Sequence, residues 1–309
     1  MRVRTIANVV RYVRSRARYS TRAPVGREYL VGTHSVSGAL SSNSRTILRL
    51  YVARTAGSGD RDAVDAVVEA ASKRSVPVIW TDRQHVHNLA GGPASVVMDV
   101  RALSPPTIDD AASLTPWHRD SRDGDQSPLV VALDQLTDPH NVGAIIRSAL
   151  LLQADWILAS ARSAAPFNAT VSKVSSGALE VFAGAGRLGI TESMPALLSD
   201  CCGREWRVLG AAAPPAERGG QLSGGGASST FRQWIPSSTL RRAGPTVLVL
   251  GSEGSGLHPA VARACSAFVH IPMSDSSSGK MVSPSWRVDS FNVSAAAAIL
   301  LHQLRLSTD

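Results

Sequence analysis

The sequence has little cysteine and no long apolar run. Its 309 residues include three cysteines and no CxxC pair, so it indicates neither a metal site nor a disulfide framework, and a reducing compartment fits best. No apolar run reaches the roughly 18 residues of a membrane-spanning helix, so we expect no membrane association. The length is sufficient for two globular domains.

Acidic residues are absent from the first 27 positions, which hold eight arginines. Those eight arginines equal the whole formal net charge of +8, so the rest of the chain is near neutral. An Arg-rich, acid-free start that contains Ser and Thr is typical of an organelle transit peptide, which we assign to residues 1–26. A basic arm that binds RNA is the alternative.

The common nucleotide-binding glycine motifs are also missing. The stretch LGSEGSGL (250–257) matches neither GxGxxG nor the P-loop pattern, which argues against an oxidoreductase with a dinucleotide cofactor. It still follows an apolar run and precedes His258-Pro259, which suits a helix start. A small-residue loop at the carboxyl end of a strand is where open α/β sheets bind ligands. A tight turn is the alternative, but a turn does not need Glu253.

The apolar pattern predicts two α/β domains. Residues 27–103 alternate strand and helix patterns, and residues 104–127, rich in Pro, Ser, Asp and Gly, are predicted to be a linker. Residues 128–309 form the second domain. Its nearly continuous apolar strands predict a parallel sheet covered on both faces, and residues 292–306 predict an apolar final helix. The Gly/Ser-rich residues 214–244 and the stretch 274–290 are predicted to be inserted surface loops.

The stretch DPHNVGAIIRSA (138–149) places Asn141 and Arg147 at an otherwise apolar helix start. A buried guanidinium is costly without an anionic partner, so Arg147 is expected to meet a local acid or a charged ligand. The alternatives are a surface arginine and, for Asn141, a helix cap. A cap is likewise the alternative for Asn292, which precedes Val293-Ser294 at the start of the final helix.

Taken together, the order and spacing of these motifs resemble those of a known enzyme family. Asn-Val-Gly with an Arg six residues after the Asn, then GSEGSGL, then IPM (271–273) and NVS (292–294), resembles the SpoU (TrmH) branch of the SPOUT RNA methyltransferases. KVSSGALE (173–180) is similar to a further segment of that family. The N-terminal part is similar to the L30e-like substrate-binding domain that precedes the catalytic domain in many members. The resemblance implies a SPOUT methyltransferase domain with a deep trefoil knot, a homodimer, and S-adenosylmethionine as the cofactor.

The resemblance also implies site residues. Arg147 is expected to bind the phosphate beside the target ribose, and Glu253 is expected to hold Arg147 before RNA arrives. Asn141 would orient either the ribose hydroxyl or Arg147. Asn292 and Ser294 would complete the catalytic site. The expected cofactor-binding residues are Leu250, Gly251, Gly254, Ile271, Met273 and Phe291.

The implied activity is transfer of a methyl group to a ribose 2′-hydroxyl of RNA. Combined with the leader, the resemblance implies large-subunit rRNA in the mitochondrial matrix as the substrate, with guanosine as the expected nucleotide. Two alternatives stay open: a tRNA 2′-O-methyltransferase, and a non-catalytic RNA-binding factor for ribosome assembly on the same fold.

Overall fold

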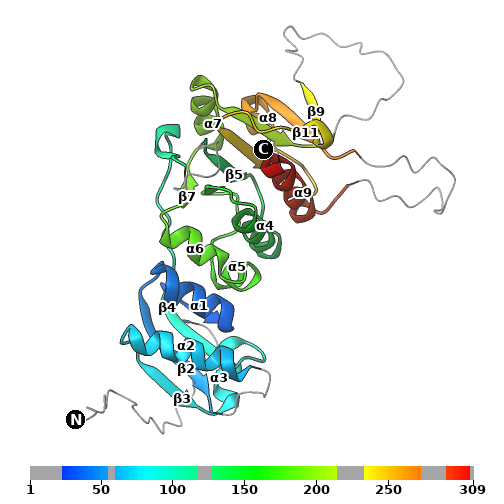
Figure 1. Ribbon diagram of the computed structural model, residues 1–309. Coiled ribbons are helices and arrows are strands. Elements are labelled where there is room, and N and C mark those ends of the chain that lie inside the picture. The colour runs from blue at the N-terminus through cyan, green and yellow to red at the C-terminus, as the bar shows by residue number, and fades with distance from the viewer. Residues whose placement is uncertain (1–22, 55–59, 117–126, 214–232, 273–289, 307–309) are drawn as a thin grey trace, which may run out of the picture. The chain divides into compact units, whose positions relative to one another are not determined.

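The computed structural model describes residues 23–54, 60–116, 127–213, 233–272 and 290–306, which form two compact units (Figure 1). Unit 1 takes the chain up to Pro105 together with Pro166–Arg187, and unit 2 takes Pro106–Ala165 and the chain from Leu188 onward. None of the helices in the described part of the chain has the length and apolar composition needed to cross a bilayer.

Unit 1 is built on a four-stranded mixed sheet in the order β1-β4-β2-β3. β4 is antiparallel to both β1 and β2, whereas β3 is parallel to β2. The strands are β1 (Arg27–Val31), β2 (Ile47–Ala53), β3 (Val78–Thr81) and β4 (Val96–Arg101). The helices are α1 (Thr33–Ser42), α2 (Arg61–Lys73), α3 (Arg83–Ala90), α5 (Ala169–Val174) and α6 (Ala178–Gly184).

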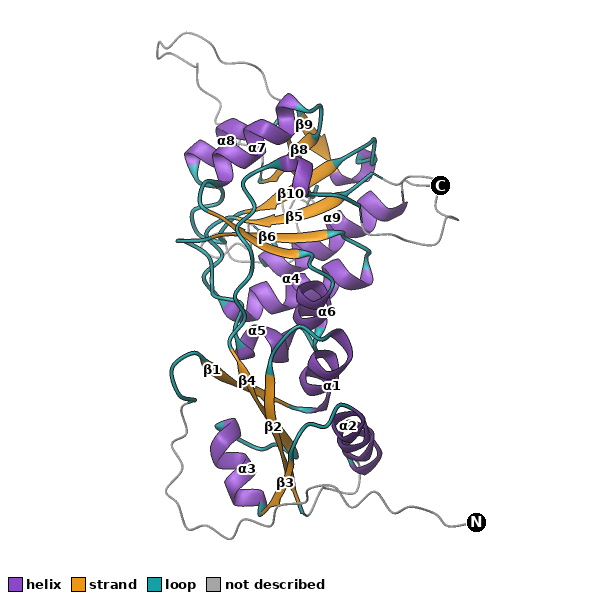
Figure 2. Ribbon diagram, turned by 90° about the vertical axis from the view of Figure 1, so that its left-hand side faces the viewer, coloured by secondary structure: helices purple, strands orange, loops and turns teal. Residues whose placement is uncertain are grey.

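Helices cover both faces of this sheet, as Figure 2 shows. On one face, α1 and α2 contribute buried residues such as Val36, Leu40 and Val67 to a core with Leu50 and Met98 of the strands. On the other face, α3 packs a smaller core against the same sheet. Because successive residues of a strand point to opposite faces, the apolar runs of β2 and β4 fill both cores.

Unit 2 is built on a seven-stranded sheet in the order β7-β6-β5-β10-β8-β11-β9, in which every neighbouring pair is parallel. The strands are β5 (Leu129–Leu133), β6 (Trp156–Ser160), β7 (Leu188–Thr191), β8 (Arg207–Ala211), β9 (Trp234–Pro236), β10 (Thr246–Leu250) and β11 (Ala267–His270). All five residues of β5 and of β10 are buried, as expected for central strands of a parallel sheet.

Four helices cover the two faces of this sheet (Figures 1 and 2): α4 (Pro139–Leu151) and α9 (Val293–Leu306) lie side by side on one face, and α7 (Met194–Gly203) and α8 (Pro259–Ala264) lie on the other. Two short 3-10 helices are η1 (Ala111–Ser113) and η2 (Ser237–Thr239). Apolar residues at helical spacing place one buried stripe of each long helix on the sheet.

The parallel sheet and the final helix confirm the predicted α/β architecture. The prediction of a surface loop over 214–244 is wrong for its last part, because β9 pairs with β11 and Ile235 is buried. Residues 214–232 and 274–289 lie outside the described residues. In the predicted linker, Ile108 and Leu114 are buried in the core of unit 2.

Asp134 contacts both ends of the loop that follows β10, once through its backbone and once through its carboxylate. Asp134, directly after β5, is 2% exposed, and its backbone N–H donates to the carbonyl of Leu250 at 2.8 Å. Its Oδ2 accepts a hydrogen bond from the backbone N–H of His258 at 2.8 Å. Burial raises the pKa of the Asp134 carboxyl, an effect that the His258 N–H only partly offsets. Asp134 therefore fixes both ends of residues 251–257, which we call the glycine loop.

Replacing Asp134 by Asn tests this tether through the pH dependence of stability. Because the native pKa is raised, the contribution of the carboxyl to stability is full below its ordinary value of 3.8 and is lost as the pH rises through the native pKa. Asn keeps an oxygen that can accept from His258 but has no charge to bury. We therefore expect Asp134→Asn to gain unfolding free energy relative to the natural chain as the pH rises from 3.8 toward neutrality.

Urea unfolding at a series of pH values measures this difference. Asp65→Asn, which changes an exposed carboxylate on α2, is the matched control and should follow the natural chain. If the curves of Asp134→Asn and the natural chain stay parallel across the range, burial of Asp134 has no energetic consequence and the argument is wrong.

Candidate active site

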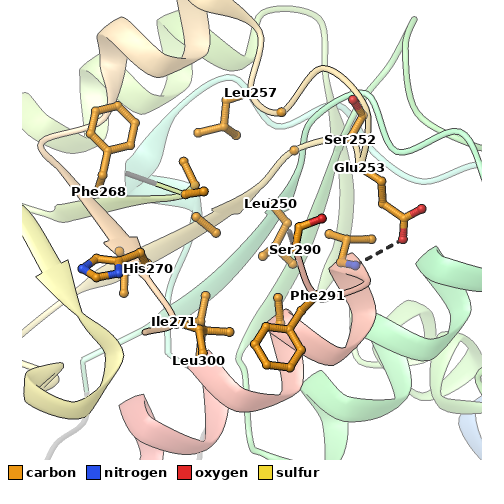
Figure 3. Close-up of a pocket in the computed structure, with 18 of the residues that line it drawn as sticks. Leu250, Ser252, Glu253, Leu257, Phe268, His270, Ile271, Ser290, Phe291 and Leu300 are labelled. Atoms are coloured by element: carbon orange, nitrogen blue, oxygen red, sulfur yellow. Dashed lines mark hydrogen bonds between the residues drawn. The ribbon is translucent and has the colours of Figure 1, made fainter. Parts of the chain in front are cut away.

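A cavity of about 510 Å³ lies at the carboxyl edge of the unit 2 sheet (Figure 3). Parallel strands bring their carboxyl ends to the same edge, so segments far apart in sequence meet there. The cavity is lined by residues that follow β8, β10 and β11 and by the start of α9: Ala211, Ala212, Ala213, Leu250, Gly251, Ser252, Glu253, Gly254, Ser255, Gly256, Leu257, Ala262, Phe268, Val269, His270, Ile271, Ser290, Phe291, Val293, Ala296 and Leu300.

Glu253 is the one acid among these lining residues, and it joins three segments. Its Oε1 accepts hydrogen bonds from Nδ2 of Asn141 at 3.2 Å and from Nδ2 of Asn292. The same oxygen accepts from the backbone N–H of Val293, the first residue of α9, at 3.2 Å. Figure 3 marks a hydrogen bond of Glu253 with a dashed line. A carboxylate at this position also interacts favourably with the positive end of the α9 dipole.

Asn292 uses both ends of its amide. Its Nδ2 donates to Oδ1 of Asn141 at 3.0 Å as well as to Glu253. Its Oδ1 accepts from the backbone N–H of Ser294 at 2.9 Å and from the Ser294 hydroxyl. Asn292 therefore caps α9 and also bonds to Glu253 and Asn141. Its capping role does not exclude a place in the candidate site. We call Asn141, Glu253, Asn292 and Ser294 the rim cluster.

Arg147 differs from the expectation in two ways. It is exposed on α4, so the argument from a costly buried guanidinium is wrong. It does not line the cavity, and within the described part of the chain no hydrogen bond or ion pair joins it to another residue. The expected Glu253–Arg147 pairing is absent there, because the Glu253 oxygen instead accepts from the two amides and from Val293.

The predicted cofactor-binding residues gather at the cavity wherever the structure describes them. Leu250, Gly251, Gly254, Ile271 and Phe291 all line it, as part of the set given above. Met273 lies outside the described residues. The family motifs contain these residues, which is why the sequence pointed to them.

The glycine loop closes on itself at the cavity. Ser252 and Gly256 exchange two backbone hydrogen bonds of 3.0 Å, and Gly256 adopts a left-handed φ of 69°. A side chain at Gly251 would place its Cβ 2.5 Å from the carbonyl carbon and oxygen of Gly256. Glycine is therefore required at 251 for the loop to close, and not only for close approach of a ligand.

One residue that supports the cavity wall, Trp234, was not predicted from the sequence. Trp234 of β9 stacks on Phe268 with ring centroids 4.8 Å apart, and it meets His270 edge to face at 6.5 Å. Phe268 and His270 both line the cavity, so Trp234 supports its wall from the sheet edge. The available signal was the short segment Trp234-Ile235 near the end of a Gly/Ser-rich stretch, and the composition of that stretch indicated a loop.

The cavity suits a ligand with a flat apolar group and a cationic group. Leu250, Leu257, Phe268 and Ile271 supply apolar walls, visible around the opening in Figure 3. Strand ends leave backbone N–H and C=O groups for hydrogen bonding. Glu253 supplies one negative charge at the rim. Within the described residues no group of three or more His, Cys, Asp and Glu side chains is arranged to hold a metal ion.

Comparison with known proteins covers both units. Residues 128–302 match the family model described as the SpoU rRNA Methylase family, and residues 29–106 match the model described as RNA 2'-O ribose methyltransferase substrate binding. The second match confirms a substrate-binding domain ahead of the methylase domain.

Two relatives and one solved structure are similar over most of their length. The mitochondrial rRNA methyltransferase 1 of Schizosaccharomyces pombe is 31% identical over 300 residues, covering 90% of this chain and 89% of the relative. The 23S rRNA (guanosine-2'-O-)-methyltransferase RlmB of Pseudomonas aeruginosa is 29% identical, covering 90% and 95%.

The crystal structure of the SpoU methyltransferase AviRb from Streptomyces viridochromogenes, determined in complex with AdoMet, superimposes with a TM-score of 0.62 at 20% identity and covers 91% of this chain and 90% of that one. This likeness supports the α/β fold described above for both units. The SpoU rRNA methylase model spans more than half of the sequence, and the chain therefore belongs to that family.

Proposed function

We propose that this chain transfers a methyl group from S-adenosylmethionine to a ribose 2′-hydroxyl of mitochondrial large-subunit rRNA. The observation that carries the proposal is the rim cluster at the cavity in a member of this family. Relatives named mitochondrial rRNA methyltransferase 1 support the rRNA substrate and the organelle, and RlmB, named for guanosine 2'-O-methylation, supports guanosine. The Arg-rich start supports import into the matrix.

The residues of the cavity fit S-adenosylmethionine. Its apolar walls suit the adenine, and the open backbone groups after β8, β10 and β11 suit the polar edges of the nucleoside. When bound, the cofactor supplies a methyl group activated by its positively charged sulfur. Glu253 gives the cavity a negative charge that favours this cation over the neutral product.

The rim cluster holds the reacting groups in position. Asn292 and Val293 fix the Glu253 carboxylate, and Glu253 in turn orients the amide of Asn141. We assign Asn141 the role of orienting the 2′-hydroxyl for in-line attack. Because the Glu253 oxygen already accepts three hydrogen bonds, we assign it a positioning role.

Arg147 binds the RNA backbone in this proposal. A guanidinium stays protonated at any physiological pH, so Arg147 is not a general base. It is exposed and has no partner in the described part of the chain, so it is available for bidentate contact with a phosphate. Its positive charge also stabilises the oxygen that develops negative charge during attack.

The homodimer and the trefoil knot also belong to the proposal. Leu151 and Leu306, at the ends of α4 and α9, are 69% and 54% exposed, which supports a contact between two copies on that helix pair. The position of β10 between β5 and β8 in the sheet is compatible with a knot.

Arg147→Ala should abolish most methyl transfer while leaving the cofactor site intact. We expect kcat/KM for RNA to fall about 10- to 100-fold, the scale of one charge-assisted hydrogen-bond pair, and the Kd of S-adenosylmethionine to stay within about twofold. Methyl transfer to rRNA and tRNA transcripts and calorimetric titration of the cofactor measure the two effects.

Arg204→Ala is the matched control for this substitution, because Arg204 follows α7 at the opposite edge of the sheet and pairs with Asp110 and Asp200. An Arg147→Ala chain with full activity would exclude the role assigned to the guanidinium. Transfer by the natural chain to tRNA alone would exclude the proposed rRNA substrate.

Glu253→Gln should weaken cofactor binding in a charge-dependent way. The amide can still accept from Asn141 but carries no negative charge, so the affinity for S-adenosylmethionine should fall about tenfold. The neutral product S-adenosylhomocysteine should lose less than about threefold by the same reasoning. Glu192→Gln, at a half-exposed acid after β7, serves as the control for charge alone. Equal losses for both ligands would contradict an electrostatic role for Glu253.

Gly251→Ala should remove cofactor binding, because the added Cβ meets the Gly256 backbone at 2.5 Å and the glycine loop cannot close. Gly203→Ala, where no atom lies within 4 Å of the added Cβ, is the matched control. Calorimetry with S-adenosylmethionine and thermal unfolding are measured together. Retention of the affinity of the natural chain by Gly251→Ala would show that loop closure does not depend on this glycine.

A further inference from the structure

A buried ion pair lies in unit 1. The side chains of Arg45 and Glu180 are both 0% exposed, and Nε of Arg45 donates to the two carboxylate oxygens at 3.1 and 3.0 Å. The Ser44 hydroxyl donates to Glu180 at 2.6 Å, and Nη1 of Arg45 donates to Glu28 at 2.7 Å. A buried pair of this kind is costly to desolvate, so its geometry must be well satisfied to persist.

Glycines bring the backbones around this pair into direct contact. A Cβ at Gly38 of α1 would lie 2.9 Å from the carbonyl oxygen of Gly177, and a Cβ at Gly177 would lie 2.7 Å from that of His34. A Cβ at Gly184, at the end of α6, would lie 2.1 Å from the carbonyl oxygen of Ser42. Helices α1 and α6 therefore pack without room for a methyl group between them.

The helices held by this contact come from the methylase part of the sequence. Residues 128–302 match the SpoU methylase model, yet residues 166–187, which contain α5 and α6, are compact with unit 1. The chain accordingly passes between the two units at three places, 105–106, 165–166 and 187–188. If α5 and α6 leave unit 1, only the connection at 105–106 still ties the substrate-binding unit to the catalytic one.

We propose that Arg45 and Glu180 are positioning residues that keep α5–α6 docked in unit 1, so that three chain connections instead of one link the substrate-binding unit to the catalytic unit. This inference rests on the function proposed above and adds a requirement for RNA recognition. An RNA held by both units binds with an effective concentration set by the linkage between them. Loss of two of the three connections removes constraints on how the units move relative to each other and so lowers that effective concentration.

Undocking of α5–α6 should change the KM for RNA and leave the chemical step unchanged. Cofactor binding and the chemical step use the cavity and the rim cluster of unit 2, which contain none of the residues in this contact. Undocking of α5–α6 should therefore raise the KM for RNA, with kcat at saturating RNA and the Kd of S-adenosylmethionine unchanged. Burial raises the pKa of the Glu28 carboxyl, an effect that the neighbouring Arg45 only partly offsets.

The experiment compares three variants of the full chain. Glu180→Gln removes one of the two carboxylate charges that Arg45 faces, and should raise the KM for rRNA about tenfold or more, with kcat and cofactor Kd within about twofold. The triple variant Glu28→Gln/Arg45→Met/Glu180→Met replaces all three charged groups by neutral side chains of similar size, a change that is often neutral for stability, and should restore KM. Glu69→Gln, which breaks the exposed Glu69–Lys73 pair, is the control and should match the natural chain.

Amide hydrogen exchange over residues 169–184 provides the structural readout. Exchange should be faster in Glu180→Gln and return toward the natural rate in the triple variant. Faster exchange with an unchanged KM would show that the docking is structural only and would overturn the inference. A raised KM with unchanged exchange would overturn it too, because the helices would then have stayed docked. A natural chain without methyl transfer to any RNA would overturn the proposed function, and this inference with it.

Discussion

The site depends on one carboxylate oxygen that three segments share. Oε1 of Glu253 accepts hydrogen bonds from Asn141 in the first turn of α4, from Asn292, which caps α9, and from the first N–H of α9 itself. Asn141 and Asn292 are separated by 151 residues in sequence, and Glu253 holds them 3.0 Å apart. A residue without a side-chain acceptor at 253 would leave the α9 N–H and the Asn141 amide without this acceptor, and Nδ2 of Asn292 would keep only its bond to Asn141, so the rim cluster would no longer be held together.

The parallel sheet is what makes this meeting possible. Buried runs such as β5 and β10 direct their carboxyl ends to one edge, where the chain must turn into polar segments. Asp134 then fixes the glycine loop at that edge through Leu250 and His258. The direction of the strands and a few polar side chains therefore account for the site. Together they bring apolar walls, a closed loop and a carboxylate to one edge of the sheet.

The sequence predicted those parts of the molecule where short patterns decide structure. The apolar runs predicted the central strands, and the motif order predicted which loops surround the cavity. It failed where structure depends on distant partners. Arg147 sits in an apolar stretch, yet it faces solvent, since helical spacing sets its direction and the identity of its neighbours in sequence does not. Trp234 forms part of a strand because β11 is available to pair with it, a fact that no local composition reports.

The exposure of Arg147 strengthens the case for its role instead of weakening it. If Arg147 were paired with Glu253, that charge-assisted bond would have to break before RNA could bind. The free energy of breaking it would weaken the affinity for RNA. In the observed arrangement the carboxylate is satisfied by neutral amides, and the guanidinium remains solvated and unpaired among the described residues. In unit 1, by contrast, the Arg45 side chain is buried, and its Nε and Nη1 donate to Glu180 and Glu28, which suits the positioning role proposed for it. The proposed roles thus assign RNA binding to the exposed arginine and positioning to the buried one, in agreement with their burial.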